Sequence, residues 1–132
     1  MTGFTTYFVN KVMDHSLGGV SWTPPTTVYL KLHVGNPGPD GTANPAATSS
    51  ATTGTNIRKA ATWSAAANGL IALAADVTWV ATAKESISHI SGWDAVTAGN
   101  CLFTDELEEA KNLYVGDTFD LSAATLQITP EA

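Results

Sequence analysis

The run from Thr26 to Gly38, TTVYLKLHVGNPG, constrains the fold of this chain more than any other segment. Its side chains alternate in character with a period of two, which is typical of a strand with one buried face. The expected buried set is Val28, Leu30, Leu32 and Val34, and the expected outer set is Tyr29, Lys31 and His33. Four turn-forming residues, Gly35-Asn36-Pro37-Gly38, then end the run. The segment therefore predicts a strand over Thr27–Val34.

A helical pattern precedes this strand. Apolar residues recur at three- and four-residue spacing between a capping threonine, Thr5 or Thr6, and the stop Gly18-Gly19. The spacing predicts an amphipathic helix over Thr6–Leu17, whose stripe must pack on a sheet or on a neighbouring subunit. The residues of that stripe are Phe8, Val9, Val12, Met13 and Leu17.

The stretch Pro37–Thr55 contains no large apolar residue. Loops of this length are usually functional or disordered, so the sequence predicts an exposed loop that the core does not need. Deleting Gly41–Gly54 is accordingly expected to leave the fold intact. Contacts with other subunits are expected at its Pro37, Pro39, Asn44 and Pro45.

From Ile57 onward the pattern is β. Asn68-Gly69 is a strong hairpin signal. A face shared by Ile71, Leu73, Val77 and Trp79 predicts one strand, and Ser86–Asp94 predicts another. Further signals are a turn at Thr97–Asn100, a polar connection at Glu108–Asn112, and a last strand carrying Leu126 and Ile128.

These elements indicate a mainly β fold. We expect an antiparallel β-sandwich, jelly-roll-like, of about seven or eight strands with one short N-terminal α-helix. No helix of useful length separates the strands, which argues against parallel βαβ units. The chain is expected to form one domain over residues 1–132, made of the helix and its stop (1–19), the long loop (37–55) and a β-rich remainder (56–132).

Composition argues against several classes of partner. The net charge is −6, charged residues make up 14% of the chain, and the only adjacent basic pair is Arg58-Lys59. Nucleic acids and anionic membranes attract basic stripes, and none is present. A single cysteine allows no internal disulfide, and the sequence contains no secretory signal or transmembrane span.

Motifs for catalysis and metal binding are weak. His33 and His89 could bind a metal with Asp94 or Asp76, but no short histidine spacing supports this over ordinary surface histidines. The acidic run Asp105, Glu106, Glu108, Glu109 is expected to be a solvated hairpin or loop tip rather than a site for calcium or a basic partner. No GxSxG motif is present, Cys101 is expected to be a buried structural thiol, and no carboxylate pair stands out for glycoside hydrolysis. We predict no catalytic residue, no metal and no cofactor.

Three of the four tryptophans fall into two groups. Trp79 and Trp93 share a parity with core-type residues and are expected inside. Trp22 lies between the helix and Pro24-Pro25, a position suited to a staple or an interface anchor. Exposed tryptophans on a β-fold could also bind sugars, so a carbohydrate-binding module remains an alternative.

Four segments in this order resemble a family of small tailed-bacteriophage virion proteins, described as tail-fibre or minor structural proteins. The segments are VYLKLHVGNPG, Arg58-Lys59-Ala60 leading to Trp63, ISHISGWDAVTAGNCLF, and VGDTFDLSAATLQIT. They are similar to the family's YxALHxxDPG-like strand, its Tyr-Ala-Arg-Gln-like strand start, its HxGxxDAxxGG-like hairpin and its GDTxxF segment. Lys31 stands where a small residue is usual, and Asn100 stands in place of a glycine.

The resemblance implies a non-enzymatic virion protein, assembled in the host cytoplasm. A short, single-domain chain without coiled-coil or collagen-like repeats favours capsid decoration by a symmetric oligomer, with a trimer favoured. The alternative is a tail-fibre or minor tail protein, which could be a host-glycan-binding β-module. The implied partners are the major capsid protein or tail proteins. The expected contact residues are Phe8, Val9, Val12, Met13, Leu17, Trp22, Pro37, Pro39, Asn44 and Pro45.

Overall fold

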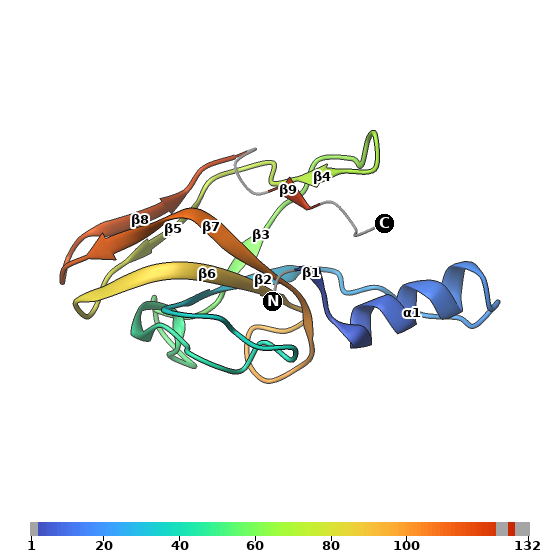
Figure 1. The fold of residues 1–132 in the computed structure, drawn as a ribbon, viewed down its shortest axis with the longest axis horizontal. Helices are drawn as coiled ribbons and strands as arrows, with labels where there is room; N and C mark the ends of the chain where they lie inside the picture. The colour runs from blue at the N-terminus through green and yellow to red at the C-terminus, as the bar shows by residue number, and fades with distance from the viewer. Residues whose placement is uncertain (1–2, 124–126, 129–132) are drawn as a thin grey trace.

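A computed structural model describes residues 3–123 and 127–128 of the chain. In these residues the fold is mainly β and antiparallel, with a single α-helix near the N-terminus, as predicted (Figure 1). The elements are β1 (Gly3–Phe4), α1 (Thr6–Ser16), β2 (Val28–His33), the 3₁₀ turn η1 (Ala47–Ser49), β3 (Lys59–Ala61), β4 (Ile71–Ala72), β5 (Val77–Val80), β6 (Glu85–Trp93), β7 (Cys101–Leu113), β8 (Thr118–Leu121) and β9 (Gln127–Ile128).

Three antiparallel sheets make up the β part. The largest has the strand order β1-β7-β6-β2-β3, and β5–β8 and β4–β9 form two smaller ladders. Large apolar side chains from β2, β6 and β7 meet those of β5 and β8 in one core. Its fully buried members include Leu30, Leu32, Trp79, Ile87 and Ile90. The β5–β8 ladder therefore covers one end of the large sheet (Figure 1).

Both faces of β2 are covered, whereas the sequence predicted one. Leu30 and Leu32 are buried in the core as expected. Val34, also expected inside, is 42% exposed because the strand ends at His33 and the chain turns there to bond Asn44. His33, expected on the outer face, is completely buried. The second face is inside because the segment 35–56 folds back over it.

Strand lengths also differ from expectation. The polar residues Glu108–Asn112 are part of β7, not a connection, because β7 continues to pair with the start of β6 as far as Glu85↔Leu113. The acidic run around Glu106 consequently lies on a strand of the antiparallel β6–β7 hairpin, which is the hairpin alternative of the prediction and not the loop tip. The predicted run from Ile71 to Trp79 is divided into β4 and β5. Asn68 and Gly69 form the predicted hairpin turn, with φ of 55° and 74°.

The last predicted strand lies partly outside the described residues. Ile128 is in β9 and pairs with Ile71, whereas Leu126 is not among the described residues.

Candidate functional site

Helix α1 is fixed to the sheet at its first turn only. Thr5 caps it, as expected, by accepting a hydrogen bond from the Phe8 amide at 3.3 Å. The same hydroxyl donates to the carbonyl of Cys101 at 2.6 Å, and the Thr5 amide donates to the carbonyl of Leu102 at 2.9 Å. Because these carbonyls belong to β7, the start of the helix is held by the large sheet.

The far end of α1 extends away from the sheet (Figure 1). No residue of the helix is buried, and its apolar stripe becomes more exposed along its length. Phe8, Val9 and Val12 are half-buried, Met13 is 52% exposed and Leu17 is 83% exposed. Gly19, at φ 69°, turns the chain, and the Val20 amide donates to Asp14 O at 3.0 Å. The end of the helix therefore presents apolar side chains that this chain does not cover.

Aromatic rings stabilise the base of the helix. Phe8 makes edge-on contacts with Phe4 and Trp22, at centroid distances of 4.8 Å and 6.0 Å. Trp22 thus fulfils the expected role of a staple within the chain. Beside this cluster is an apolar cavity of about 170 Å³, bordered by Phe4, Phe8, Val28, Trp63, Ile71, Leu102 and Phe103.

The segment predicted as an exposed loop is partly a core element. Ala46, Thr48 and Ser49 are buried, and the Ser49 hydroxyl accepts a hydrogen bond from the Leu32 amide at 2.8 Å. Pro37, expected to contact another subunit, is fully buried within this one. Deleting residues 41–54 would remove this buried layer, so the structure leads us to expect that the deletion destabilises the fold. Pro39, Asn44 and Pro45 remain exposed.

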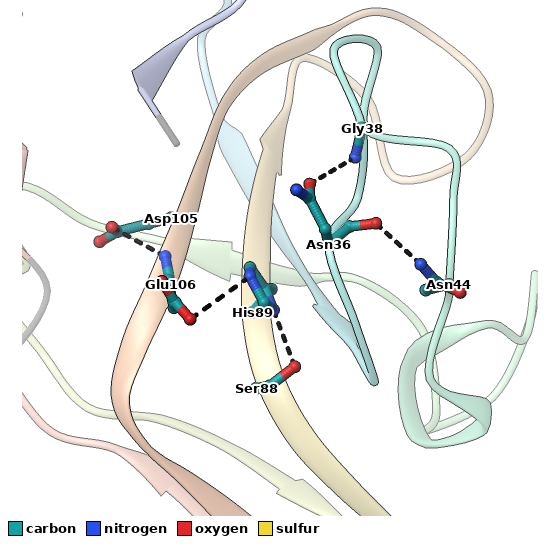
Figure 2. Close-up of polar contacts among 7 residues, drawn as sticks. All are labelled: Asn36, Gly38, Asn44, Ser88, His89, Asp105 and Glu106. Carbon is teal, nitrogen blue, oxygen red and sulfur yellow. Dashed lines mark hydrogen bonds and ion pairs between the residues drawn. The ribbon is translucent and has the colours of Figure 1, made fainter. Parts of the chain in front are cut away.

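Short-range hydrogen bonds shape the exposed part of this loop (Figure 2). The Asn36 side chain accepts a hydrogen bond from the Gly38 amide, and its carbonyl accepts one from the Asn44 side chain, both at 2.9 Å. Asn44 has a φ of 51°, which asparagine tolerates better than most residues. These hydrogen bonds therefore hold the loop that carries Pro39 and Pro45 in a defined conformation.

Glu85 on β6 fastens the buried part of the loop. Its carboxylate accepts hydrogen bonds from the amides of Ala47 and Thr48, each at 2.9 Å, and from the Thr48 hydroxyl. The first residues of η1 thus gain the acceptors that a helix start lacks. Nothing in the sequence identified this residue, since its partners are distant along the chain.

We predict that Glu85→Ala lowers the free energy of unfolding by about 2 kcal/mol, because the amides of η1 lose a charged acceptor. Urea denaturation measures the loss, and hydrogen exchange at Ala47 and Thr48 should quicken. Glu108→Ala, which removes an exposed carboxylate of β7, is the matched control. Unchanged exchange at η1 in the Glu85 variant would contradict this role.

A buried polar chain crosses the second face of β2. The His33 Nδ1 donates to Ala43 O at 2.9 Å, and the Ser91 hydroxyl lies 2.7 Å from both His33 Nε2 and Trp93 Nε1. Burial lowers the pKa of His33 to about 4, so the imidazole is neutral at pH 7, and since an indole N–H only donates and a carbonyl only accepts, one pattern then satisfies these contacts. Trp93 donates to Ser91, Ser91 donates to Nε2, and His33 is neutral with its proton on Nδ1.

His33 and His89 face each other across β2 and β6, as the metal-site alternative required. His89 on β6 lies 2.7 Å from the hydroxyl of the adjacent Ser88. It lies 3.9 Å from the carboxylate of Glu106 on the neighbouring strand β7 (Figure 2). Asp94 instead accepts hydrogen bonds from Asn100. Within residues 3–123 and 127–128, no three histidine, cysteine or acidic side chains converge as metal ligands.

The predicted core positions of three residues are confirmed. Trp79, Trp93 and Cys101 are at most 5% exposed. Burial raises the pKa of the Cys101 thiol to about 12, so it is protonated and a poor nucleophile at neutral pH. In the described part of the chain, no helix is both long and apolar enough to span a membrane.

Comparison with known families gives a match over nearly the whole chain. The family model of the podophage GP4 fiber I protein gp80 matches residues 3–129. The chain belongs to this gp80 family. The match includes α1, every strand and the long loop, so the resemblance to small tailed-phage virion proteins is confirmed over nearly the whole chain. Membership of the gp80 family makes this a phage structural protein of the virion. No curated protein matches the chain.

Proposed function

We propose that this chain is a non-enzymatic structural component of a podophage tail fibre, attached to a neighbouring tail protein through the free end of α1. The name of the matched family supports a fibre in preference to the head decoration that the short, repeat-free chain favoured. The observation that carries the attachment is the helix itself, which is fixed at Thr5 and has no buried residue.

The chemistry of the helix end suits a protein partner. Met13, Leu17 and Val20 are each at least half exposed, and they follow one another along the same end of the molecule. Covering an exposed leucine contributes about 2 kcal/mol, so even a small contact repeated in a particle would be stable. Charged side chains are depleted in the centre of protein interfaces, and those three side chains are apolar.

We expect the chain also to form a closed homo-oligomer, with three copies as the favoured number. Sedimentation equilibrium of the purified protein tests this expectation. A mass equal to one copy at all concentrations would exclude self-association in the absence of the virion.

The attachment is tested with Leu17→Lys in a phage that depends on a supplied copy of this protein. We expect normal thermal unfolding, because Leu17 is 83% exposed and a cation is favourable at a helix C-terminus. We expect at least a tenfold loss of incorporation into particles, measured by quantitative immunoblotting. The matched control is Val115→Lys, at a 73% exposed valine beyond the end of β7.

Equal incorporation of the Leu17 and Val115 variants would refute attachment through α1. Loss of incorporation in both would indicate a nonspecific effect of added charge, and would also count against the proposal.

A further inference from the structure

The second face of the large sheet contains two cations that the fibre role does not explain. Lys31 on β2 lies directly opposite Ser91 on β6, beside the buried chain formed by His33, Ser91 and Trp93. Arg58 comes just before β3, which pairs with the other edge of β2. They represent two of the six basic residues in a chain of net charge −6. A cluster of positive charge therefore lies on a chain whose net charge is negative.

Both cations contact the same indole. The guanidinium carbon of Arg58 is 4.0 Å from the centroid of the Trp93 ring, and the Lys31 ammonium is 5.9 Å from it. Arg58 Nη1 also donates to the carbonyls of Ala95 and Ala98, at 2.9 Å and 2.7 Å. The guanidinium is thus held in one orientation, while its other nitrogens remain available as donors.

In the described residues, no carboxylate forms an ion pair with Lys31 or Arg58. The one ion pair within residues 3–123 and 127–128 joins His89 to Glu106. Asp94, the carboxylate whose charge acts on Arg58, accepts two hydrogen bonds from Asn100. The Cys101 thiol nearby is protonated at neutral pH, with a pKa of about 12. Asp94 therefore acts on Arg58 through its charge but forms no ion pair with either cation, so neither cation has a carboxylate bonded directly to it in the described residues.

The pKa values of both cations are lowered, as expected for two positive charges held close together and partly buried. Burial lowers the pKa of Lys31, and the charge of Arg58 lowers it further. Burial also lowers the pKa of Arg58. Desolvation and mutual repulsion both disfavour the charged forms, and a bound anion would relieve the repulsion.

A cavity of about 190 Å³ opens beside these two side chains. Lys31 and Arg58 border it together with the segments 49–52 and 96–98. Hydroxyl groups of Ser50, Thr52 and Thr97 are part of the border. The cavity therefore combines two cations with neutral polar groups, and no acidic residue borders it.

We propose that this cavity binds an oxyanion, the carboxylate or phosphate group of a small ligand, between Lys31 and Arg58. An ammonium and a guanidinium fork supply charge-assisted hydrogen bonds, which are stronger than those between neutral groups. The bordering Thr52 and Thr97 side chains can donate to further oxygens of the ligand, whereas the Ser50 hydroxyl already donates to the carbonyl of Ala46 at 2.6 Å. This site is independent of attachment through α1, so either proposal can fail without the other.

The test is a nuclear magnetic resonance titration of the whole protein at constant ionic strength. The probes are inorganic phosphate, glucose 6-phosphate, acetate, glucuronate and, as the neutral comparison, glucose. We expect anions to shift the Trp93 indole N–H and the amides of Thr52 and Ala98, with dissociation constants of about a millimolar. The phosphate and carboxylate probes together identify which oxyanion is preferred, and glucose should cause no shift.

Lys31→Met, which keeps the aliphatic stem, should weaken the binding of the preferred anion at least tenfold. Lys111→Met removes a lysine from an exposed position on β7 and should leave it unchanged. Unchanged affinity in the Lys31 variant would overturn the proposal, as would the absence of any saturable shift at about ten times the expected dissociation constant. Equal shifts with glucose would show that charge is not recognised and would also overturn it.

Discussion

Gly92→Ala is expected to destabilise the protein by about 3 kcal/mol and lower its melting temperature by roughly 10 °C. Gly92 on β6 is paired with Phe103 on β7, and the phenyl ring lies over the glycine. A β-carbon at position 92 would be 2.1 Å from the nearest ring atom of Phe103, far inside van der Waals contact. Because the ring is buried in the core, it cannot move aside without disturbing its neighbours. Differential scanning calorimetry measures the effect.

A second substitution distinguishes this clash from a general loss of strand propensity. Phe103→Leu removes the ring, so Gly92→Ala should cost much less in a Phe103→Leu background than in the parent. A double-mutant cycle gives the difference as a coupling energy. If the two substitutions are additive, close packing at Gly92 is not the cause.

The stability of the protein should fall by about 3 kcal/mol as the pH falls from 6.5 to 4. Burial lowers the pKa of His33 from 6.5 to about 4, since the folded protein holds its imidazole neutral. The unfolded chain binds a proton below pH 6.5, whereas the folded chain binds it only near pH 4. Protons therefore favour the unfolded state across this window, and the loss levels off below pH 4 as His33 becomes charged in both states.

Urea denaturation at a series of pH values measures this slope. His33→Gln should be less stable than the parent at pH 7 but should lose the His33 contribution to the slope between pH 6.5 and 4. His15→Gln, at an exposed histidine, should keep the parental slope. A parental slope in the His33 variant would show that another group is responsible.

Patterns that depend on local sequence predicted the local structure well. The Thr5 cap, the end of α1 near Gly18-Gly19 and the turn at Asn68-Gly69 each follow from residues close together in the chain. The buried positions of Leu30 and Leu32 follow from the period of two. In all these cases the residue's own neighbours decide its conformation.

Burial of small and polar residues could not be predicted in the same way. Ala46, Thr48 and Ser49 carry no hydrophobic signal, and they are inside because Glu85 and Leu32 supply hydrogen-bond partners from distant strands. His33 is inside for the same kind of reason, through Ser91. Alternation along one strand cannot show whether a later loop will cover its second face.

The two candidate sites differ in the same way, because one depends on residues that are close in the sequence and the other on residues that are distant. The spacing of apolar residues alone predicts the apolar stripe of α1, because the residues that form it are close together in the sequence. The meeting of Lys31 and Arg58 over Trp93 depends on the pairing of β2 with β3 and β6, which no local pattern contains. The adjacent pair Arg58-Lys59 was the only trace of it in the sequence.

Immunogold electron microscopy of purified phage particles tests the central claim, that this chain is a structural part of the tail fibre. An antibody against the exposed loop around Pro39 and Asn44 provides the label, because both of these side chains are exposed. The account predicts gold at the tail, at a few positions per particle. Gold distributed over the head shell, or particles that contain none of the protein, would contradict it.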